Sequence, residues 1–259
     1  MERLKKYQGY LLDLDGTIYR GTEPIPEAIE FVKRLQERNI PFLFLTNNSS
    51  KTQLQVAEKL NSYGLTITVD HVYTSSMAAA RFLVQENQHE RIRAYVIGEE
   101  GMIQAVKSQG IQITEDNPSH VVMGIDRHIN YEKLATACLA IRNGAKLLAT
   151  NLDRAIPTER GLLPGNGSIV SVVTTSTGIE PIVVGKPMPI ITQYALEKLG
   201  VAKDLALMVG DNYETDICTG FNAGMDTLLV FTGFTSKEDL QQKDRKPTYC
   251  IDSLNQWIL

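Results

Sequence analysis

Three aspartates in this sequence have the residue type and spacing expected of a metal site. Asp13 and Asp15 are two residues apart in the stretch DLDGT, and Asp211 lies much later in the chain, in the stretch GDNYETD. Residues at i and i+2 near the end of a strand face the same side. Neighbouring carboxylates resist being ionised together unless a cation lies beside them. Because hard divalent cations prefer oxygen ligands, this set predicts a metal site, with Mg²⁺ as the favoured ion.

A second group of residues could donate hydrogen bonds or positive charge to an anion. It consists of Lys186 in the stretch VGKP, the hydroxyl of Thr46, and the backbone amides of Asn47 and Asn48 in the stretch LTNN. The transition state of phosphoryl transfer spreads negative charge over its oxygens, so a metal ion, a cation and a ring of donors stabilise it. The two groups together predict a site for a phosphoryl group.

Each of these four stretches follows a short apolar run. The runs are residues 9–14, 40–45, 181–184 and 205–209. They are predicted strands, and the amphipathic segments between them, such as 26–38, are predicted helices. Strands that are apolar throughout and separated by helices are typical of parallel strands buried on both faces. The sequence therefore predicts an α/β fold with a Rossmann-like, doubly wound parallel sheet, which binds ligands beyond the carboxyl ends of its strands.

The middle of the chain has its own alternation of strands and helices. Predicted strands at 94–97, 120–124 and 146–150 are not followed by a comparable set of acidic and basic residues. We therefore expect an inserted α/β cap domain. The expected boundaries are 81–179 for the cap, and 1–80 together with 180–259 for the core.

Composition excludes several classes of protein. The 259 residues are 43% hydrophobic and 22% charged, near the globular average, which argues against disorder. A formal net charge of −4 argues against a nucleic-acid partner, which requires a basic face.

No apolar stretch approaches the length of about 18 residues that a membrane span needs, so no membrane association is expected. Three cysteines without CxxC spacing predict neither a disulfide framework nor a zinc site, and favour a reducing, cytoplasmic location.

Taken in order, the four stretches resemble the four motifs of the haloacid dehalogenase superfamily of phosphohydrolases. The insertion between the second and third motifs resembles subclass IIA, the NagD-like phosphatases. The stretches similar to that subclass, including its YutF-type members, are DLDGTIYRG, LTNNSSKT, TNLDR, GLLPGNGS, VGKP and GDNYETDI. The resemblance covers nearly the whole chain. It implies a C2-type cap, a Mg²⁺ cofactor and a homodimer formed through the cap.

The resemblance also implies roles for the acidic residues. Asp13 matches the nucleophile that becomes an aspartyl-phosphate, and Asp15 matches the general acid and base. The metal ligands would be the Asp13 side chain, the Asp15 backbone carbonyl and the Asp211 side chain. Asp216 would lie either beside a metal ligand or at an additional metal position.

The remaining matched positions would bind phosphate. Thr46 and Lys186 match the side chains that contact the phosphoryl group, and Lys186 would also offset the charge of the nucleophile. Gly16, Asn47 and Asn48 would offer backbone donors.

In the cap, the sequence leaves alternatives open. The stretch 161–168, GLLPGNGS, either reaches the substrate or makes tight turns. Arg127 follows a predicted strand and either binds an anion or lies in a surface turn, with the surface turn favoured. Asn151 and Asp153 follow another predicted strand and could face the core.

We therefore expect a Mg²⁺-dependent phosphatase that hydrolyses small phosphate monoesters, namely sugar, acid-sugar or nucleotide phosphates. Two alternatives stay open. A phosphotransferase or mutase would hand the phosphoryl group to another alcohol and would need an acceptor site in the cap. A regulatory binding protein would keep the phosphate site without turnover, although the intact acidic residues and Lys186 argue against it.

Overall fold

The computed structural model describes residues 5–86, 92–158 and 160–259, and the chain forms two units. The first unit comprises Met1–Thr46, Val56–Tyr73 and Lys186–Leu259, and the second comprises Asn47–Gln55 and Thr74–Gly185. The second unit overlaps the cap expected at 81–179 and also contains the loop 47–55, which no sequence pattern indicated. The boundaries of a functional cap domain stay a prediction.

The first unit is built on a six-stranded sheet. In spatial order its strands are β15 (Tyr249–Ile251), β14 (Asp226–Val230), β13 (Ala206–Gly210), β1 (Gly9–Leu12), β4 (Phe42–Thr46) and β5 (Val72–Thr74). β1 pairs in parallel with β13 on one side and β4 on the other, and Tyr10 is in register with Leu207 and Phe42. β14 pairs in parallel with β13 and β15. The carboxyl ends of these strands therefore lie at one edge of the sheet.

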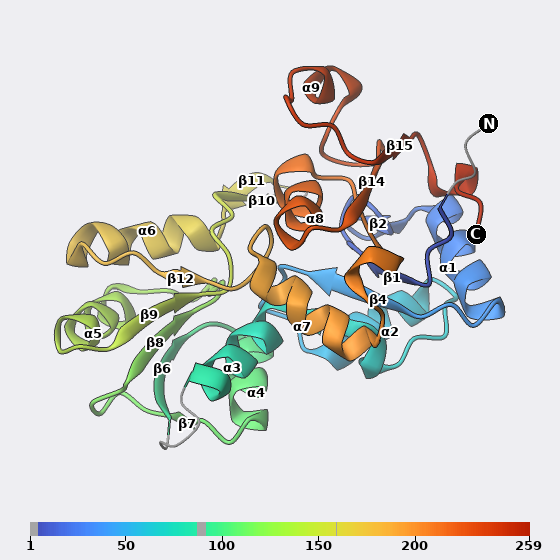
Figure 1. The fold of residues 1–259 in the computed structure, drawn as a ribbon. Coiled ribbons are helices and arrows are strands. Elements are labelled where there is room, and N and C mark those ends of the chain that lie inside the picture. The colour runs from blue at the N-terminus through green and yellow to red at the C-terminus, as the bar shows by residue number, and fades with distance from the viewer. Residues whose placement is uncertain (1–4, 87–91, 159) are drawn as a thin grey trace. The chain divides into compact units, whose positions relative to one another are not determined.

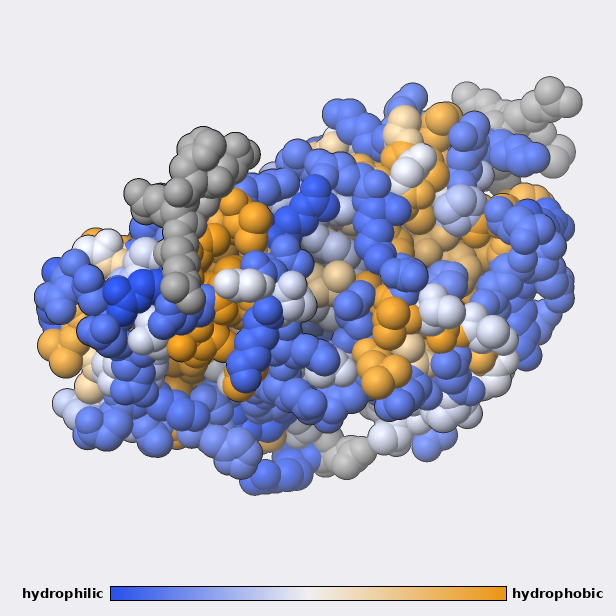
Figure 2. Space-filling model, turned by 90° about the horizontal axis from the view of Figure 1, so that it is seen from below, coloured by the Kyte–Doolittle hydropathy of each residue, from blue (hydrophilic) through white to orange (hydrophobic). Residues whose placement is uncertain are grey.

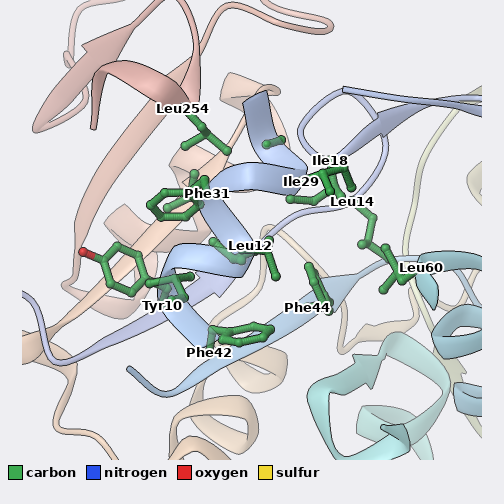
Figure 3. Close-up of a cluster of buried hydrophobic side chains, with 14 of the residues drawn as sticks. Tyr10, Leu12, Leu14, Ile18, Ile29, Phe31, Phe42, Phe44, Leu60 and Leu254 are labelled. Atoms are coloured by element: carbon green, nitrogen blue, oxygen red, sulfur yellow. The ribbon is translucent and has the colours of Figure 1, made fainter. Parts of the chain in front are cut away.

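The core of this unit explains why the central strands are apolar throughout. All residues of β1, β4 and β13 are buried. Figure 3 shows aromatic side chains of β1 and β4 beside Phe31, which lies on helix α1 (Pro26–Glu37). The ring centroids of Tyr10 and Phe31 are 5.6 Å apart, and those of Phe42 and Phe44 are 5.5 Å apart. Burial of each such side chain stabilises the fold by about 1.5–3 kcal/mol.

Helices cover both faces of the sheet. α1 has proline in its first turn and buries one stripe of residues that includes Ala28, Phe31 and Leu35, as its helical period predicts. The other α-helices that lie wholly or mostly in this unit are α2 (Gln53–Ser62), α7 (Pro189–Leu199), α8 (Cys218–Ala223) and α9 (Lys237–Gln241). In Figure 1, α1 lies on one side of β1 and β4, and α7 lies on the other. The predicted Rossmann-like, doubly wound α/β fold class is confirmed.

The second unit has a five-stranded sheet of its own. In spatial order its strands are β12 (Ile182–Val183), β9 (Lys146–Ala149), β8 (His120–Met123), β6 (Arg93–Ile97) and β7 (Gln112–Ile113). All four pairings are parallel. In Figure 1, α3 (Ser75–Glu86) and α4 (Glu100–Ser108) lie on one side of this sheet, and α5 (Tyr131–Arg142) and α6 (Asn166–Thr177) lie on the other.

Several elements were not indicated by the sequence. They are the antiparallel ribbons of β2 (Tyr19–Arg20) with β3 (Glu23–Pro24) and of β10 (Ala155–Thr158) with β11 (Gly161–Pro164), a π-helical turn at Tyr213–Ile217, and 3₁₀ turns at Val69–His71, Lys203–Leu205 and Leu254–Gln256. Helix α6 is rich in Val, Ile, Thr and Ser, residues with little preference for helices. It forms because Val170 and Val173 pack into the core of the second unit, and Gly178 ends it at φ 74°.

Hydrophilic residues predominate on the face of the molecule in Figure 2, and the hydrophobic residues on it gather in a few patches. Among the described residues, no helix combines the length and apolar character that a membrane crossing requires.

Candidate active site

The central strands bring two of the predicted aspartates to one edge of the sheet. Asp13 directly follows β1, and Asp211 directly follows β13, the neighbour of β1 on one side. Thr46 ends β4, the neighbour of β1 on the other side, and its side chain is buried. Because neighbouring parallel strands end at the same edge, residues far apart in the sequence meet there.

Three buried carboxylates form a cluster at this edge. Asp13 is 8% exposed, Asp211 is 3% exposed and Asp216 is 1% exposed. One oxygen from each of them lies within 4.8 Å of the others. All of these ligand atoms are oxygens, which is the donor set that Mg²⁺ and other hard divalent cations prefer.

Lys186 places its charge inside this cluster. Its side chain is 3% exposed, and Nζ donates to Oδ1 of Asp13 and, at 2.6 Å, to Oδ1 of Asp216. Burial alone would lower the pKa of Lys186, but Asp13 and Asp216 outweigh that effect and raise it. The lysine is therefore held as a cation.

The single positive charge of Lys186 does not neutralise three ionised carboxylates. Burial, followed by the charge of Asp216, raises the pKa of Asp13 well above its usual range, although Lys186 acts in the opposite direction. Burial and Asp216 likewise raise the pKa of Asp211 to about 6. Protons or a second cation must offset this negative charge, and the site therefore fits a divalent metal ion.

The carboxylate of Asp211 is fixed from two sides. Thr17 donates from Oγ1 to Asp211 Oδ1 at 3.1 Å, and the backbone N–H of Phe234 donates to Oδ2 at 2.6 Å. A Cβ atom at Gly16 or at Gly233 would collide with this carboxylate. Gly16 also has φ +87°, a conformation that favours glycine. The sequence analysis did not indicate that Thr17, Gly233 and Phe234 contact Asp211. Of these three, only Thr17 lies in a stretch that the analysis singled out, DLDGT.

Asp216 is held on both of its oxygens. Oδ1 accepts from Lys186, and Oδ2 accepts from the backbone N–H of Asn212 at 3.1 Å. The π-helical turn Tyr213–Ile217 places this side chain against β13, where a Cβ atom at Gly210 would collide with it. Asp216 contacts Lys186 and also offers an oxygen to the carboxylate cluster. Both expected roles of Asp216, beside a metal ligand or at an additional metal position, stay predictions.

Asp15 does not join the buried cluster. Its side chain is exposed, and Oδ1 accepts weakly from the Gly21 N–H at 3.4 Å. The neighbouring Gly16 N–H donates to the carbonyl of Tyr19 at 2.7 Å. The hydrogen bond from the Gly16 amide to phosphate stays a prediction.

The loop after β4 belongs to the second unit. The side chain of Asn48 shapes it, because Oδ1 accepts from the backbone N–H groups of Ser50 and Lys51, each at 3.0 Å. Asn47 donates from Nδ2 to Oδ2 of Asp153 at 3.3 Å. The side chains of Asn47 and Asn48 thus fix local structure, and the phosphate contacts expected from their backbone amides stay predictions.

The structure shows local contacts of two cap stretches, and the role of residues 161–168 stays a prediction. Arg127 pairs with Glu99 at 2.8 Å, which favours the surface-turn interpretation. Residues 161–168 divide between strand β11 and the start of α6. A Cβ atom at Gly165 or Gly167 would collide with backbone atoms of Asp153 or Leu152, so these two glycines are required by packing. In the same stretch, Leu162 is 73% exposed.

A parallel α/β sheet with three carboxylates and a buried lysine beyond its central strands has the groups that a phosphoryl-transfer hydrolase needs. A family model described as haloacid dehalogenase-like hydrolase matches residues 10–112, and a second HAD-like hydrolase model matches residues 183–257. The chain belongs to the haloacid dehalogenase-like hydrolases, as its four motifs indicated.

Similar proteins are enzymes of this class. The 5'-nucleotidase YutF of Bacillus subtilis is 55% identical over 255 residues, which cover 98% of this chain and 99% of that protein. An acid sugar phosphatase of Staphylococcus saprophyticus is 46% identical over 256 residues, which cover 98% of each chain. The solved structure of a double mutant of a thermostable NPPase from Geobacillus stearothermophilus has a TM-score of 0.93 at 48% identity, and covers 98% of this chain and 99% of that chain.

These findings establish the reaction class. The protein is a phosphoric monoester hydrolase, and its substrates are small phosphorylated molecules. Phosphatases of this family generally use a divalent metal ion, and the buried acidic cluster offers oxygen ligands for one.

Proposed function

We propose that this protein is a Mg²⁺-dependent phosphatase of small phosphorylated metabolites that works through an aspartyl-phosphate on Asp13. The observation that supports it is the buried cluster at the ends of β1 and β13, where Lys186 bonds Asp13 and Asp216 beside Asp211. A carboxylate held beside a cation and further oxygen ligands is suited to attack phosphorus, because charge that develops on the phosphoryl oxygens is stabilised there.

In the first step, an oxygen of Asp13 attacks the phosphorus atom. The bond from phosphorus to the leaving oxygen breaks, and Asp15 gives its proton to that oxygen. Lys186 donates to Oδ1 of Asp13 and so limits the rotation of the attacking carboxylate. Asp15 is exposed and outside the buried cluster, which leaves its carboxyl group accessible to a leaving group.

In the second step, a water molecule attacks the phosphorus of the aspartyl-phosphate. Asp15, now ionised, takes a proton from this water, and the bond from phosphorus to the Asp13 oxygen breaks. Inorganic phosphate leaves, and both aspartates return to their starting states. A Mg²⁺ ion held by the side chains of Asp13 and Asp211 and by the Asp15 carbonyl would shield the nucleophile from the negative phosphate.

The names of the relatives support a substrate class rather than one substrate. One is named a 5'-nucleotidase and another an acid sugar phosphatase. We therefore propose that the substrates are nucleoside monophosphates, sugar phosphates or acid-sugar phosphates, and that residues 161–168 contribute to the choice among them. We also propose a cytoplasmic location, which three free cysteines support, and a homodimer, which stays a prediction from the subclass.

The test is phosphate release from a panel of sugar, acid-sugar and nucleotide phosphates together with an aryl phosphate. It is run with Mg²⁺, with EDTA, and with Asp13→Asn beside the wild type. We expect release that needs both Mg²⁺ and Asp13, with a ranking that identifies the preferred leaving group. Equal release in the presence of EDTA, or wild-type rates in Asp13→Asn, would overturn the proposal.

A further inference from the structure

The segment that follows β14 reaches across the end of β13 to the turn that follows β1. In the sheet of the first unit, β13 lies between β14 and β1. The backbone N–H of Phe234 donates to Oδ2 of Asp211 at 2.6 Å. The hydroxyl of Thr232 donates to the carbonyl oxygen of Gly16, also at 2.6 Å. Residues 232–235 therefore connect the end of one central strand to the end of the other.

This segment also fixes the backbone around Asp211. The N–H of Thr235 donates to the carbonyl of Asp211 at 3.1 Å. The hydroxyl of Thr235 accepts from the N–H of Tyr213 at 2.8 Å, at the start of the π-helical turn. A Cβ atom at Gly233 would lie 2.7 Å from the Cα atom of Gly16. The segment is thus packed against both strand ends, with no room for a side chain between them.

Gly16 is held at both of its polar backbone groups. Its N–H donates to the carbonyl of Tyr19 at 2.7 Å, and its carbonyl accepts from Thr232. Arg20 closes the arrangement, because its Nε donates to the carbonyl of Thr232. Glycine has more backbone freedom than any other residue. These hydrogen bonds therefore restrict the two peptide planes that meet at Gly16.

One of these planes carries the carbonyl of Asp15. The only cis peptide among the described residues is Lys186–Pro187, so the bond from Asp15 to Gly16 is trans. In a planar trans peptide the carbonyl points opposite to the N–H. The Asp15 carbonyl therefore points away from Tyr19, and its direction depends on how Gly16 is held.

We propose that Thr232 is a positioning residue for the metal ion, and that it sets the spacing between the Asp15 carbonyl and the Asp211 carboxylate. The inference rests on the proposed function, in which these two groups and the Asp13 side chain hold Mg²⁺. The Thr232 hydroxyl acts on the first ligand through the peptide plane shared with Gly16. The same segment holds the second ligand directly.

A spacing set by the protein matters most for a small ion. Mg²⁺ requires near-octahedral oxygen ligands at about 2.0–2.1 Å, whereas Ca²⁺ accepts about 6–8 oxygens at about 2.3–2.6 Å in a flexible geometry. Loss of the Thr232 hydroxyl should therefore weaken the binding of Mg²⁺ more than that of Ca²⁺. General damage to the first unit would weaken the binding of both ions alike.

The experiment measures the melting temperature of the metal-free protein as Mg²⁺ or Ca²⁺ is added. An ion that binds the folded state raises this temperature by an amount that its dissociation constant sets. Thr232→Val keeps the shape of the side chain and removes the hydroxyl, whereas Thr232→Ser keeps the hydroxyl. No substrate is present, so the readout does not depend on turnover.

We expect Thr232→Val to raise the dissociation constant of Mg²⁺ by about tenfold, because contacts that orient metal ligands have effects of this size. The dissociation constant of Ca²⁺ should rise less. Thr232→Ser should bind Mg²⁺ as the wild type does.

A matched control in the same unit separates positioning from the loss of any buried threonine hydroxyl. The Thr248 hydroxyl accepts from the N–H of Thr227 at 3.0 Å, near the start of β14 and so at the opposite end of that strand from Thr232. Thr248→Val should lower the melting temperature of the metal-free protein without changing either dissociation constant. Thr232→Ala removes the same hydroxyl as Thr232→Val, and it keeps the test valid if Thr232→Val does not fold.

The inference and the proposed function fail in different ways. If the wild type binds Mg²⁺ and the dissociation constant is unchanged in folded Thr232→Val or in folded Thr232→Ala, the positioning role is overturned. Equal weakening of both ions, or a loss in Thr232→Ser as large as that in Thr232→Val, also overturns it. If the wild type releases phosphate without a divalent ion and no such ion raises its melting temperature, the metal-dependent function fails and the inference fails with it.

Discussion

Lys186 Nζ lies 2.6 Å from Oδ1 of Asp216, and both side chains are almost completely buried. The same ammonium group donates to Asp13. Lys186 is thus held between the proposed nucleophile and a carboxylate that is itself anchored to backbone. Buried ion pairs of this kind add little stability in themselves, but removal of one partner leaves an uncompensated charge.

Lys186→Met should therefore affect both turnover and stability. We expect kcat/KM to fall by about 100-fold or more, because a charge that stabilises the transition state is lost. We expect unfolding to become easier by about 3–5 kcal/mol at pH 7, because three buried carboxylates lose their cation. Steady-state kinetics and denaturant unfolding measure the two effects. Lys198→Met is the control, since its partner Asp70 is 83% exposed and the pair should contribute only about 0–1 kcal/mol.

Asp211→Asn should act mainly on the metal. The substitution keeps the shape of the side chain but removes a negative charge from the proposed ligand set. We expect the Mg²⁺ concentration for half-maximal activity to rise by at least about tenfold, and Thr17→Val, which removes a hydrogen bond to Asp211, to raise it to a smaller extent. Titration of activity with Mg²⁺ measures both. An unchanged Mg²⁺ requirement in Asp211→Asn would remove Asp211 from the metal site.

The acidic cluster predicts a pH-dependent effect of Mg²⁺ on stability. In the metal-free protein, burial raises the pKa of Asp211 to about 6 and raises that of Asp13 as well. A folded-state pKa above the unfolded value contributes stability at low pH, and this stability is lost as the pH rises through about 6. Mg²⁺ replaces the protons, so it should raise the melting temperature more at pH 7 than at pH 5. An equal increase at both pH values would contradict this assignment.

His120 predicts acid sensitivity of the second unit. Burial, and then the charge of Lys146, lower the pKa of His120 below its usual value. The unfolded chain therefore binds a proton more readily than the folded one, and stability should fall as the pH drops through the unfolded value, near 6.5. His120→Gln should show a smaller loss of melting temperature between pH 7.5 and pH 5.5 than the wild type does. His128→Gln, on the surface of the same unit, should behave as the wild type.

The fold and the buried centre of the site could be predicted because their signals are local. An apolar run followed by polar residues marks a parallel strand and its ligand-binding end, and this signal is enough to predict that Asp13 and Asp211 lie together. The same argument predicted the sheet, since strands buried on both faces leave a continuous apolar pattern.

Other features of the structure have no local signal in the sequence. Helix α6 begins at Asn166 in a segment whose residues favour strands, and only packing of the second unit makes that segment a helix. Phe234 contributes through its backbone N–H, which every residue but proline has. The pairing of Asp216 with Lys186 depends on a π-helical turn that no periodicity indicates. Tertiary packing decides each of these.

The aspartyl-phosphate on Asp13 is the central claim, and Asp15→Asn gives the most direct test of it. An aryl phosphate has a good leaving group that needs little help from an acid, so the variant should form the intermediate but lack the base that hydrolyses it. After acid quenching, mass spectrometry should find one phosphoryl group per chain, on the peptide that contains Asp13. A phosphoryl group on another residue, or an unmodified Asp13 in a variant that still releases phosphate, would contradict the account.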